Sequence, residues 1–518
     1  MTHFKQKNMI ITYAIEFLLS VLLALSSFKV IYDIKYKVFN LNSIFFTTII
    51  ICSLFYILKL INNIIKNDKK EIHKIFVSLM IPIGMFYLFF LIPGHAPDED
   101  AHYYRAYEIS TGKLISDSNE KKIPYIKIPL DLANTNKQTV TNYNLLIEKM
   151  SIETKYDDEI KVDSFTQIYF PILYTIPAMS FTISTFFNLN IIYALYLARI
   201  CNFILFLILG YYAIKIIPFG KVLLATYLFI PMVIHQGVSI SVDSIVNSMI
   251  MLFIAYILNL YFKKDPINEK EKIIFYLFAT FIAFAKTIYM PIIFISLILL
   301  FKTKNKNRSK TKFISNLFNK ENQYIWIGII LCTIIAIGWF LFTNEYRDSR
   351  EIIHNTQSDL EQTISLITSP MKYIEVILNT IIMRSGYLIN TFIGGKMGWL
   401  NIPTNEKLVV IYLFLLIIAP FTEKHEVELT KKQKILFVAI FCISTILIFT
   451  AMYVNRIAPE VKYIESLQGR YFIPIAILLL ICLCKKNKSI KIKYLNLLHP
   501  LLIISVNIIS IYKIICFF

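Results

Sequence analysis

The chain of 518 residues is 56% hydrophobic and carries a formal net charge of +19. Its hydrophobic residues form blocks of about 20, the length that an α-helix needs to cross a bilayer, and the blocks lack the alternation of a transmembrane β-strand. The positive charge lies in short lysine-rich loops, which is typical of cytoplasmic loops rather than of a nucleic-acid-binding surface. We therefore predict an all-α polytopic membrane protein whose partners include the lipid bilayer and no nucleic acid.

Residues 1–74 contain two predicted membrane helices, at 9–31 and 41–61. Lysines before the first helix and in the loop 66–74 place the N-terminus inside, in the cytoplasm, under the positive-inside rule. The first helix has no small-residue cleavage pattern after it and is read as a retained anchor. A third helix at 75–92 then runs outward.

A cluster of reactive side chains follows this third helix. Residues 94–105 hold three consecutive acids, two histidines and an arginine. The cluster opens a polar segment, residues 95–165, that has more acids than bases. Because it is too long for a plain connection, we expect it to fold as an external subdomain with short helices.

Three apolar stretches, at 168–187, 191–213 and 222–234, separate this segment from Asp243. The lysine-rich loop at 263–272 is expected inside, so parity allows only two crossings among the three. One of them must be short, broken or re-entrant. Pro171 and Pro177 make the first a candidate and Pro231 the third, and the sequence does not choose between them. Residues 75–301, including this region, are expected to form a core module.

The rest of the chain is predicted as a cytoplasmic basic loop at 302–322 and a C-terminal membrane module at 323–518. This module would have external loops at 344–406 and 455–470. The apolar stretch 373–393 starts and ends outside, so we expect it to lie at the interface or to dip in as a hairpin. The count reaches about thirteen crossings, with the C-terminus outside.

This topology gathers charged residues from distant segments at the outer side. Carboxylates at a membrane–water boundary can accept a proton or hold a hard cation such as Mg²⁺ or Mn²⁺. We therefore take Asp98, Glu99 and Asp243 as catalytic candidates, with Asp98 and Asp243 as the candidate metal ligands. The candidate substrate-binding residues are His102, Arg105, Lys286, Arg384, Gln468, Arg470 and Tyr471.

Simpler interpretations exist for several of these residues. Asp98 follows a proline and is equally well placed as a helix N-cap, and Ser241 and Asp243 also read as a cap. Single charges at helix ends are commonly solvated. A zinc site made by His95, Asp98 and His102 is disfavoured because their spacing matches no tight ligand pattern.

Several motifs in the chain resemble domain-of-unknown-function family 2142, a group of predicted bacterial membrane proteins. They occur in order from about residue 75 to 485. The segments are Pro97–Tyr107 with Gly112, Tyr169–Tyr174, Ala198–Asn202, Ile230–Met232, Ser239–Asp243, Ala285–Pro291, Gly395–Pro403 and Gln468–Pro474.

That family is similar to the C-type glycosyltransferases, multi-span enzymes that take sugars from polyprenyl-phosphate carriers and have an acid in the first external loop. The resemblance implies a GT-C-like helical bundle in which Asp98 or Glu99 is the base or metal ligand and Asp243 the second acid. The chain departs from the pattern in its two extra N-terminal spans and in Asn401, which stands where an acid is expected.

The expected function is a glycosyltransferase of the bacterial cytoplasmic membrane, moving a sugar from a polyprenyl-phosphate carrier to a cell-surface glycan acceptor at the outer face. Lys286, Arg470 and Arg384 would neutralise the carrier phosphate. The alternatives are a lipid-linked glycan flippase, a small-solute transporter or a glycan polymerase. Charges at span ends, rather than mid-span, favour an interfacial enzyme over a transporter.

Overall fold

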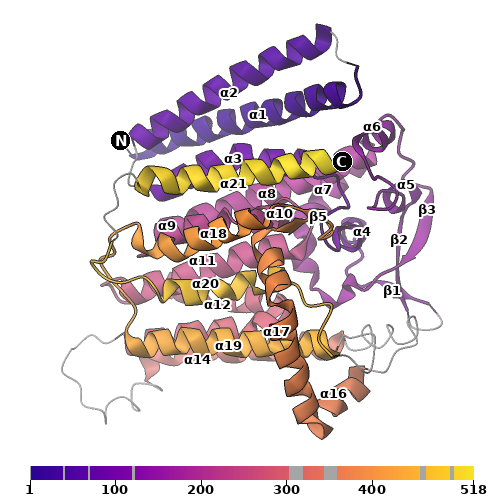
Figure 1. Ribbon diagram of the computed structural model, residues 1–518. Helices are drawn as coiled ribbons and strands as arrows, with labels where there is room; N and C mark the ends of the chain where they lie inside the picture. Colours follow the sequence, from indigo (N-terminus) through magenta and orange to yellow (C-terminus); the bar gives the residue numbers. More distant parts are fainter. Residues whose placement is uncertain are drawn as a thin grey trace.

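The computed structural model of the chain describes residues 2–38, 41–67, 71–119, 123–302, 319–343, 359–454, 462–489 and 495–518. Most of the helices run side by side in layers, and a small subdomain with strands lies at one end of the bundle, on the right in Figure 1. We call this the subdomain end. The predicted basic loop 302–322 and the two C-terminal external loops lie partly outside the described residues.

Nine helices among the described residues are long and apolar enough to cross a membrane. They are α1 (Thr2–Lys35), α2 (Leu41–Asn67), α3 (Ile72–Phe90), α8 (Ile191–Ile216), α11 (Val242–Phe262), α14 (Gln323–Phe342), α17 (Pro370–Ile393), α19 (Lys431–Val454) and α21 (Leu495–Phe517). The prediction of an all-α polytopic membrane protein is confirmed.

Shorter elements account for most of the difference from the predicted thirteen crossings. The helices α12 (Glu269–Phe284), α18 (Glu406–Ile418) and α20 (Ile473–Ile481) run alongside the long ones in Figure 1. The 15-residue η3 (Thr287–Phe301) is a 3₁₀-helix. Because a 3₁₀-helix rises about 2.0 Å per residue, η3 is as long as about 20 residues of α-helix.

The structure resolves which of the three stretches before Asp243 is short. After the 3₁₀-turn η2 (Pro171–Tyr174), α7 (Thr175–Phe186) has 12 residues, which is about 18 Å and too short to span a bilayer. The third stretch is broken into α9 (Lys221–Leu228) and α10 (Pro231–Gly237). The break falls at Pro231, which cannot donate the backbone hydrogen bond of a continuous helix.

The subdomain contains a sheet that the sequence did not predict. Its helices are α4 (Glu99–Ser110), α5 (Leu130–Ala133) and α6 (Tyr143–Met150). Its strands β1 (Asp117–Ser118), β2 (Pro124–Pro129) and β3 (Glu159–Asp163) form an antiparallel sheet in the order β1-β2-β3. Ile126 and Ile128 are buried and alternate with more exposed residues. Four of the six residues are buried, two of them prolines, and so short a stretch with proline at both ends is too weak a period-two signal to identify it.

The helix α17 differs from the other long helices in direction. It follows α16 (Asp359–Thr368) and runs across the direction of α18 and α19 in Figure 1. Because α17 is one continuous helix, residues 373–393 do not form a hairpin, and their position at an interface stays a prediction. The loop after α17 carries the short strands β4 (Lys396–Met397) and β5 (Ile402–Pro403).

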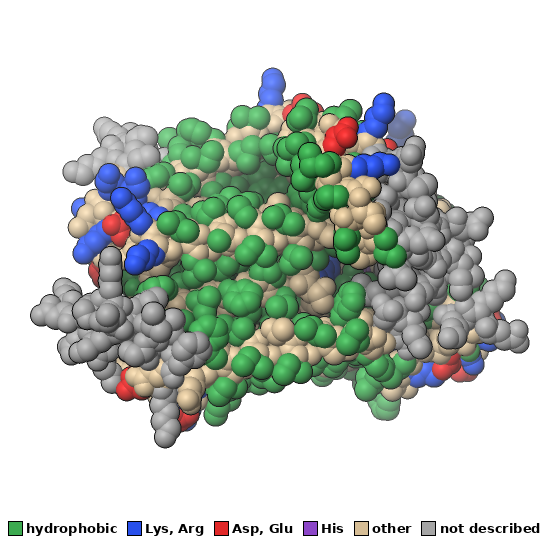
Figure 2. Space-filling view, turned by 90° about the horizontal axis from the view of Figure 1, so that it is seen from below, with side chains coloured by type: hydrophobic (Ala, Val, Ile, Leu, Met, Phe, Trp, Pro, Cys, Tyr) green, Lys and Arg blue, Asp and Glu red, His purple; other side chains and the backbone are tan. Residues whose placement is uncertain are grey.

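The outer surface of the bundle is apolar. Figure 2 shows hydrophobic side chains over the middle of one face, with Lys and Arg side chains gathered mainly toward its ends. Exposed residues of α14 and α19, such as Ile334, Ile337 and Ile446, belong to this kind of surface. Such a band fits contact with lipid. The hairpin of α1 and α2 packs on α3, where Ser78 donates a 2.5 Å hydrogen bond to the buried Glu16.

Candidate functional site

The first acid of the candidate site, Asp98, sits at the N-cap of α4. Its backbone is left-handed, with φ 60°, and its side chain makes no capping hydrogen bond. The position is the predicted one for a cap, but the carboxylate instead accepts a 2.7 Å hydrogen bond from Nη2 of Arg470. The Asp98 side chain is 51% exposed. It is therefore both anchored and accessible.

The 3₁₀-turn η6 (Gly469–Phe472) positions Arg470 by packing against α17. The Gly469 amide donates to the Thr391 hydroxyl at 2.7 Å, and a Cβ at position 469 would lie 1.8 Å from the carbonyl oxygen of Leu388. Only glycine allows so close an approach. Arg470 Nε donates to the Gln468 side chain at 2.6 Å, which fixes the guanidinium.

The second acid, Asp243, lies in the first turn of α11. Its carboxylate is 2.5 Å from Lys286 Nζ and 3.5 Å from Arg470 Nη1, and it accepts a 3.2 Å hydrogen bond from Gln236. Arg470 thus lies between two acids that are 145 residues apart in the chain. We call Asp98, Asp243, Lys286 and Arg470 the charge cluster.

Aromatic side chains surround the two cations. Lys286, at the apex between α12 and η3, lies 5.6 Å from the ring of Tyr169 and 5.8 Å from that of Tyr471. Arg470 is 5.1 Å from the Tyr471 ring, and Tyr289 donates to the Tyr471 carbonyl at 2.9 Å. Such rings favour nearby cations and exclude water from them.

Burial and the neighbouring charges together set the protonation of Asp98 and His102. Burial alone would raise the pKa of Asp98, but the charge of Arg470 and its hydrogen bond outweigh that effect and hold the pKa below its ordinary value. Burial lowers the pKa of His102 to about 4, against the attraction of Asp98 and Asp243. At neutral pH His102 is therefore a neutral ring, with Nδ1 2.8 Å from the Tyr174 hydroxyl.

The predicted metal site does not fit this arrangement. Among the described residues, no group of three or more His, Cys, Asp and Glu side chains is arranged to hold a metal ion. Arg470 pairs with both Asp98 and Asp243, and Lys286 pairs with Asp243. His95 is directed elsewhere, with Nε2 2.8 Å from the Val140 carbonyl oxygen. The two acids therefore hold protein cations rather than forming an open set of metal ligands.

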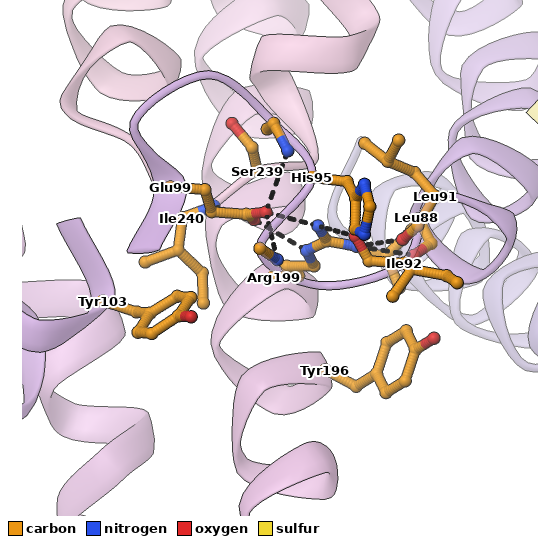
Figure 3. A network of polar contacts seen from close by, with 12 residues as sticks. Leu88, Leu91, Ile92, His95, Glu99, Tyr103, Tyr196, Arg199, Ser239 and Ile240 are labelled. Atoms are coloured by element: carbon orange, nitrogen blue, oxygen red, sulfur yellow. Dashed lines mark hydrogen bonds and ion pairs between the residues drawn. The ribbon is translucent and has the colours of Figure 1, made fainter. Parts of the chain in front are cut away.

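Glu99 is separated from the charge cluster although it adjoins Asp98. Its carboxylate is fully buried and forms a bidentate pair with Arg199 of α8, at 2.8 and 2.6 Å (Figure 3). The backbone amides of Gly94 and Ile240, in the loops that lead to Asp98 and Asp243, also donate to this carboxylate. All of these partners belong to the protein, so Glu99 has the contacts of a structural residue and is not accessible to a substrate.

Two predicted substrate-binding arginines also lie outside the charge cluster. Arg105 is buried and pairs with Glu108, and it donates to the Leu114 carbonyl oxygen at 2.6 Å. Arg384 donates to the Glu465 carbonyl oxygen at 2.9 Å and lies 4.0 Å from the Tyr387 ring. The structure thus gives Arg105 a structural role and places Arg384 on the surface of α17.

Two residues that the sequence interpretation left out of the candidate site make contacts that shape it. Arg199 is the one charged residue of the apolar helix α8 before Lys215 in its last turn, and such a position marks a paired or functional residue. Trp399, in the turn between β4 and β5, donates from Nε1 to the Gly94 carbonyl oxygen at 3.1 Å and so contacts the first acid-bearing loop.

An apolar hollow of about 570 Å³ is lined in part by residues 170–172, which directly follow Tyr169 in the chain. Tyr169 faces Lys286, and the next residue, Phe170, lines the hollow and stacks on Phe284 with ring centroids 3.6 Å apart. The other walls come from the end of α4, from α7 and from α14, and they include Ile109, Met179, Trp339 and Phe342.

The fold and site define an α-helical polytopic membrane protein with a buried charge cluster where the helices meet a polar subdomain. Within that class, the chain belongs to the family described as predicted membrane protein (DUF2142), whose model matches residues 82–479. The match includes every member of the charge cluster and excludes α1 and α2. No curated protein and no solved structure matches the chain.

Proposed function

We propose that the protein is a glycosyltransferase of the bacterial cytoplasmic membrane. It would move a sugar from a polyprenyl-phosphate carrier to a cell-surface glycan or a related acceptor, with the subdomain end facing outward. The observation that carries this proposal is the sharing of Arg470 by two distant carboxylates, one of them half exposed, beside a second cation. This combination supplies both a base and a binding site for phosphate.

In the proposed reaction the acceptor hydroxyl oxygen attacks the anomeric carbon of the donor sugar. The hydroxyl proton passes to Asp98, and the bond between the anomeric carbon and the carrier phosphate oxygen breaks, leaving its electron pair on the phosphate. Arg470 and Lys286 stabilise that negative charge. Asp243, which is only 7% exposed, keeps both cations in place.

The ion pairing also suggests an order of events. Arg470 pairs with Asp98 at 2.7 Å. A phosphate bound by Arg470 weakens that pair and raises the pKa of Asp98 toward its ordinary value, because the guanidinium charge is then shared. Donor binding would therefore prepare the base for the acceptor.

The apolar hollow supports a lipid-linked donor over a soluble one. It lies one residue along the chain from Tyr169, which contacts Lys286, and its wall is made mostly of apolar side chains. A hydrocarbon chain leaving a phosphate at the charge cluster would find an apolar path there.

The proposal is tested by the variants Asp98→Asn and Asp243→Asn, assayed for sugar transfer from a polyprenyl-phosphate donor in proteoliposomes. We expect losses of about a hundredfold or more for Asp98→Asn, because it removes the base. Asp157→Asn, on the exposed surface of the subdomain, is the matched control. Wild-type transfer by both site variants would refute the proposal, and solute uptake into the same vesicles would favour a transporter.

A further inference from the structure

The Glu99 carboxylate connects the two loops that carry the acids of the charge cluster. Oε2 accepts hydrogen bonds from the amides of Gly94 at 2.9 Å and Ala96 at 3.3 Å, in the loop that leads to Asp98. Oε1 accepts from the amide of Ile240 at 3.0 Å, three residues before Asp243. A single side chain thus holds both loops (Figure 3).

Arg199 extends this connection to the helix that delivers the first loop. Besides its two bonds to Glu99, its guanidinium donates to the carbonyl oxygens of Leu88 and Ile92, each at 3.2 Å, and to that of Leu91. These carbonyl groups are at the C-terminal end of α3, where no further helical amide is available to bond them. Arg199 therefore fixes the point at which the chain leaves α3.

The same helix, α8, also holds the second loop directly. Asn202, three residues after Arg199, donates from Nδ2 to the Ser239 carbonyl oxygen at 3.0 Å. Both loops are thus tied to one face of α8. Stability alone does not explain why an ion pair is buried at this position, because a buried ion pair is often no more stabilising than apolar side chains of similar volume.

We propose that the buried Glu99–Arg199 pair is a positioning device: it sets the separation of the loops 94–98 and 239–243, so that Asp98 and Asp243 reach the same guanidinium of Arg470. The catalytic consequence of this inference rests on the proposed function. The two contacts to Arg470, at 2.7 and 3.5 Å, leave little room for displacement. A shift of about 1 Å at a reacting group can reduce a rate strongly.

The test compares the double variant Glu99→Gln/Arg199→Gln with the wild-type protein in detergent. It removes both charges together, so no unpaired buried charge remains. Hydrogen exchange is measured by mass spectrometry for peptides covering 94–98 and 239–243. We expect exchange at both to rise about tenfold, because the amides of Gly94 and Ile240 lose a charged acceptor. Exchange in the middle of α3 and α8 should not change.

The matched control is the double variant Arg105→Gln/Glu108→Gln. It removes a second buried ion pair of the same helix, α4, whose described partners do not include residues 239–243. It should leave exchange in the peptide 239–243 at the wild-type rate. An equal rise in both double variants would mean that loss of any buried pair loosens the structure, and would overturn the inference.

Kinetics provide a second readout. For the Glu99 and Arg199 double variant, the positioning role predicts a turnover number at least tenfold lower, with the KM for the donor within about twofold of wild type. Unchanged exchange in both loops, or full turnover, would overturn the inference. If the double variant does not fold, Arg199→Lys keeps the charge but loses the fork geometry, and the same exchange pattern is expected. Exchange needs no sugar donor, so failure of the proposed function would not affect this readout.

Discussion

The two acids of the charge cluster have different surroundings, and the proposed reaction gives them different roles accordingly. The Asp98 side chain is half exposed and bonds to one cation, whereas Asp243 is buried and contacts two. A base must reach its substrate and needs exposure, while an acid that orients cations must stay fixed. The same comparison removes Glu99 from the catalytic set, because its oxygens are committed to Arg199 and to backbone amides.

His102 provides a prediction about pH. Its pKa falls to about 4 in the folded protein, against an ordinary value of 6.5. Between these values the unfolded chain binds a proton that the folded chain does not, so stability falls as the pH is lowered. From pH 7 to pH 5 this amounts to about 2 kcal/mol.

Thermal unfolding in detergent at a series of pH values tests this prediction. His102→Gln keeps a polar partner for Tyr174 but cannot titrate, so its melting temperature should fall less than that of the wild-type protein between pH 7 and pH 5. Other histidines contribute equally to both proteins, and the difference between the curves isolates position 102. Parallel curves would contradict the assignment.

At the scale of elements, the contact between η6 and α17 determines where Arg470 lies. The variant Gly469→Ala would place a Cβ 1.8 Å from the carbonyl oxygen of Leu388 and 2.5 Å from the Phe392 nitrogen. Both are backbone atoms, so the two elements must move apart. We expect a loss of about 2 kcal/mol or more in stability, and a larger fractional loss of transfer activity because Arg470 moves with its turn.

Gly386 is the matched control for this substitution. It lies on the exposed side of α17, and a Cβ there meets no atom within 4 Å. Because alanine favours a helix over glycine, Gly386→Ala should raise stability by about 0.5–1 kcal/mol. Similar melting temperatures for the two variants would show that the close contact at Gly469 does not constrain the turn.

The sequence predicted the elements whose signals are local. Long apolar blocks became the long helices, and Pro231 marks the observed break. The sequence did not show whether the stretch that forms α7 or the stretch that forms α9 and α10 fails to span, because proline occurs in both. Both stretches depart from a plain span in the structure, because α7 has only 12 residues and Pro231 separates α9 from α10.

Prediction of the site had a similar limit. The outer-side assignment of Asp98, Asp243, Lys286 and Arg470 needed only topology, and the structure brings these four together. Topology alone could not show that Asp98 and Glu99, which are adjacent in the chain, have different partners. The left-handed backbone at Asp98 directs the two carboxylates to different partners, and that conformation comes from tertiary contacts.

At the scale of the whole molecule, the orientation in the membrane decides whether the charge cluster can serve an outer-face reaction. The described parts of the lysine-rich loops lie at the end of the bundle opposite the subdomain (Figure 1), so the positive-inside rule predicts an external subdomain. Glu153→Cys in the subdomain and Lys424→Cys in a lysine-rich loop place single thiols at exposed positions on the two sides. The background lacks the seven native cysteines.

A membrane-impermeant maleimide should label position 153 in intact cells, and position 424 only after the membrane is permeabilised. The cysteine-free parent should stay unlabelled in both conditions. The reverse pattern would place Asp98 and Arg470 on the cytoplasmic side. A carrier whose sugar is presented at the outer leaflet would then be out of reach of the charge cluster, and the proposed reaction would have to draw its donor from the cytoplasm.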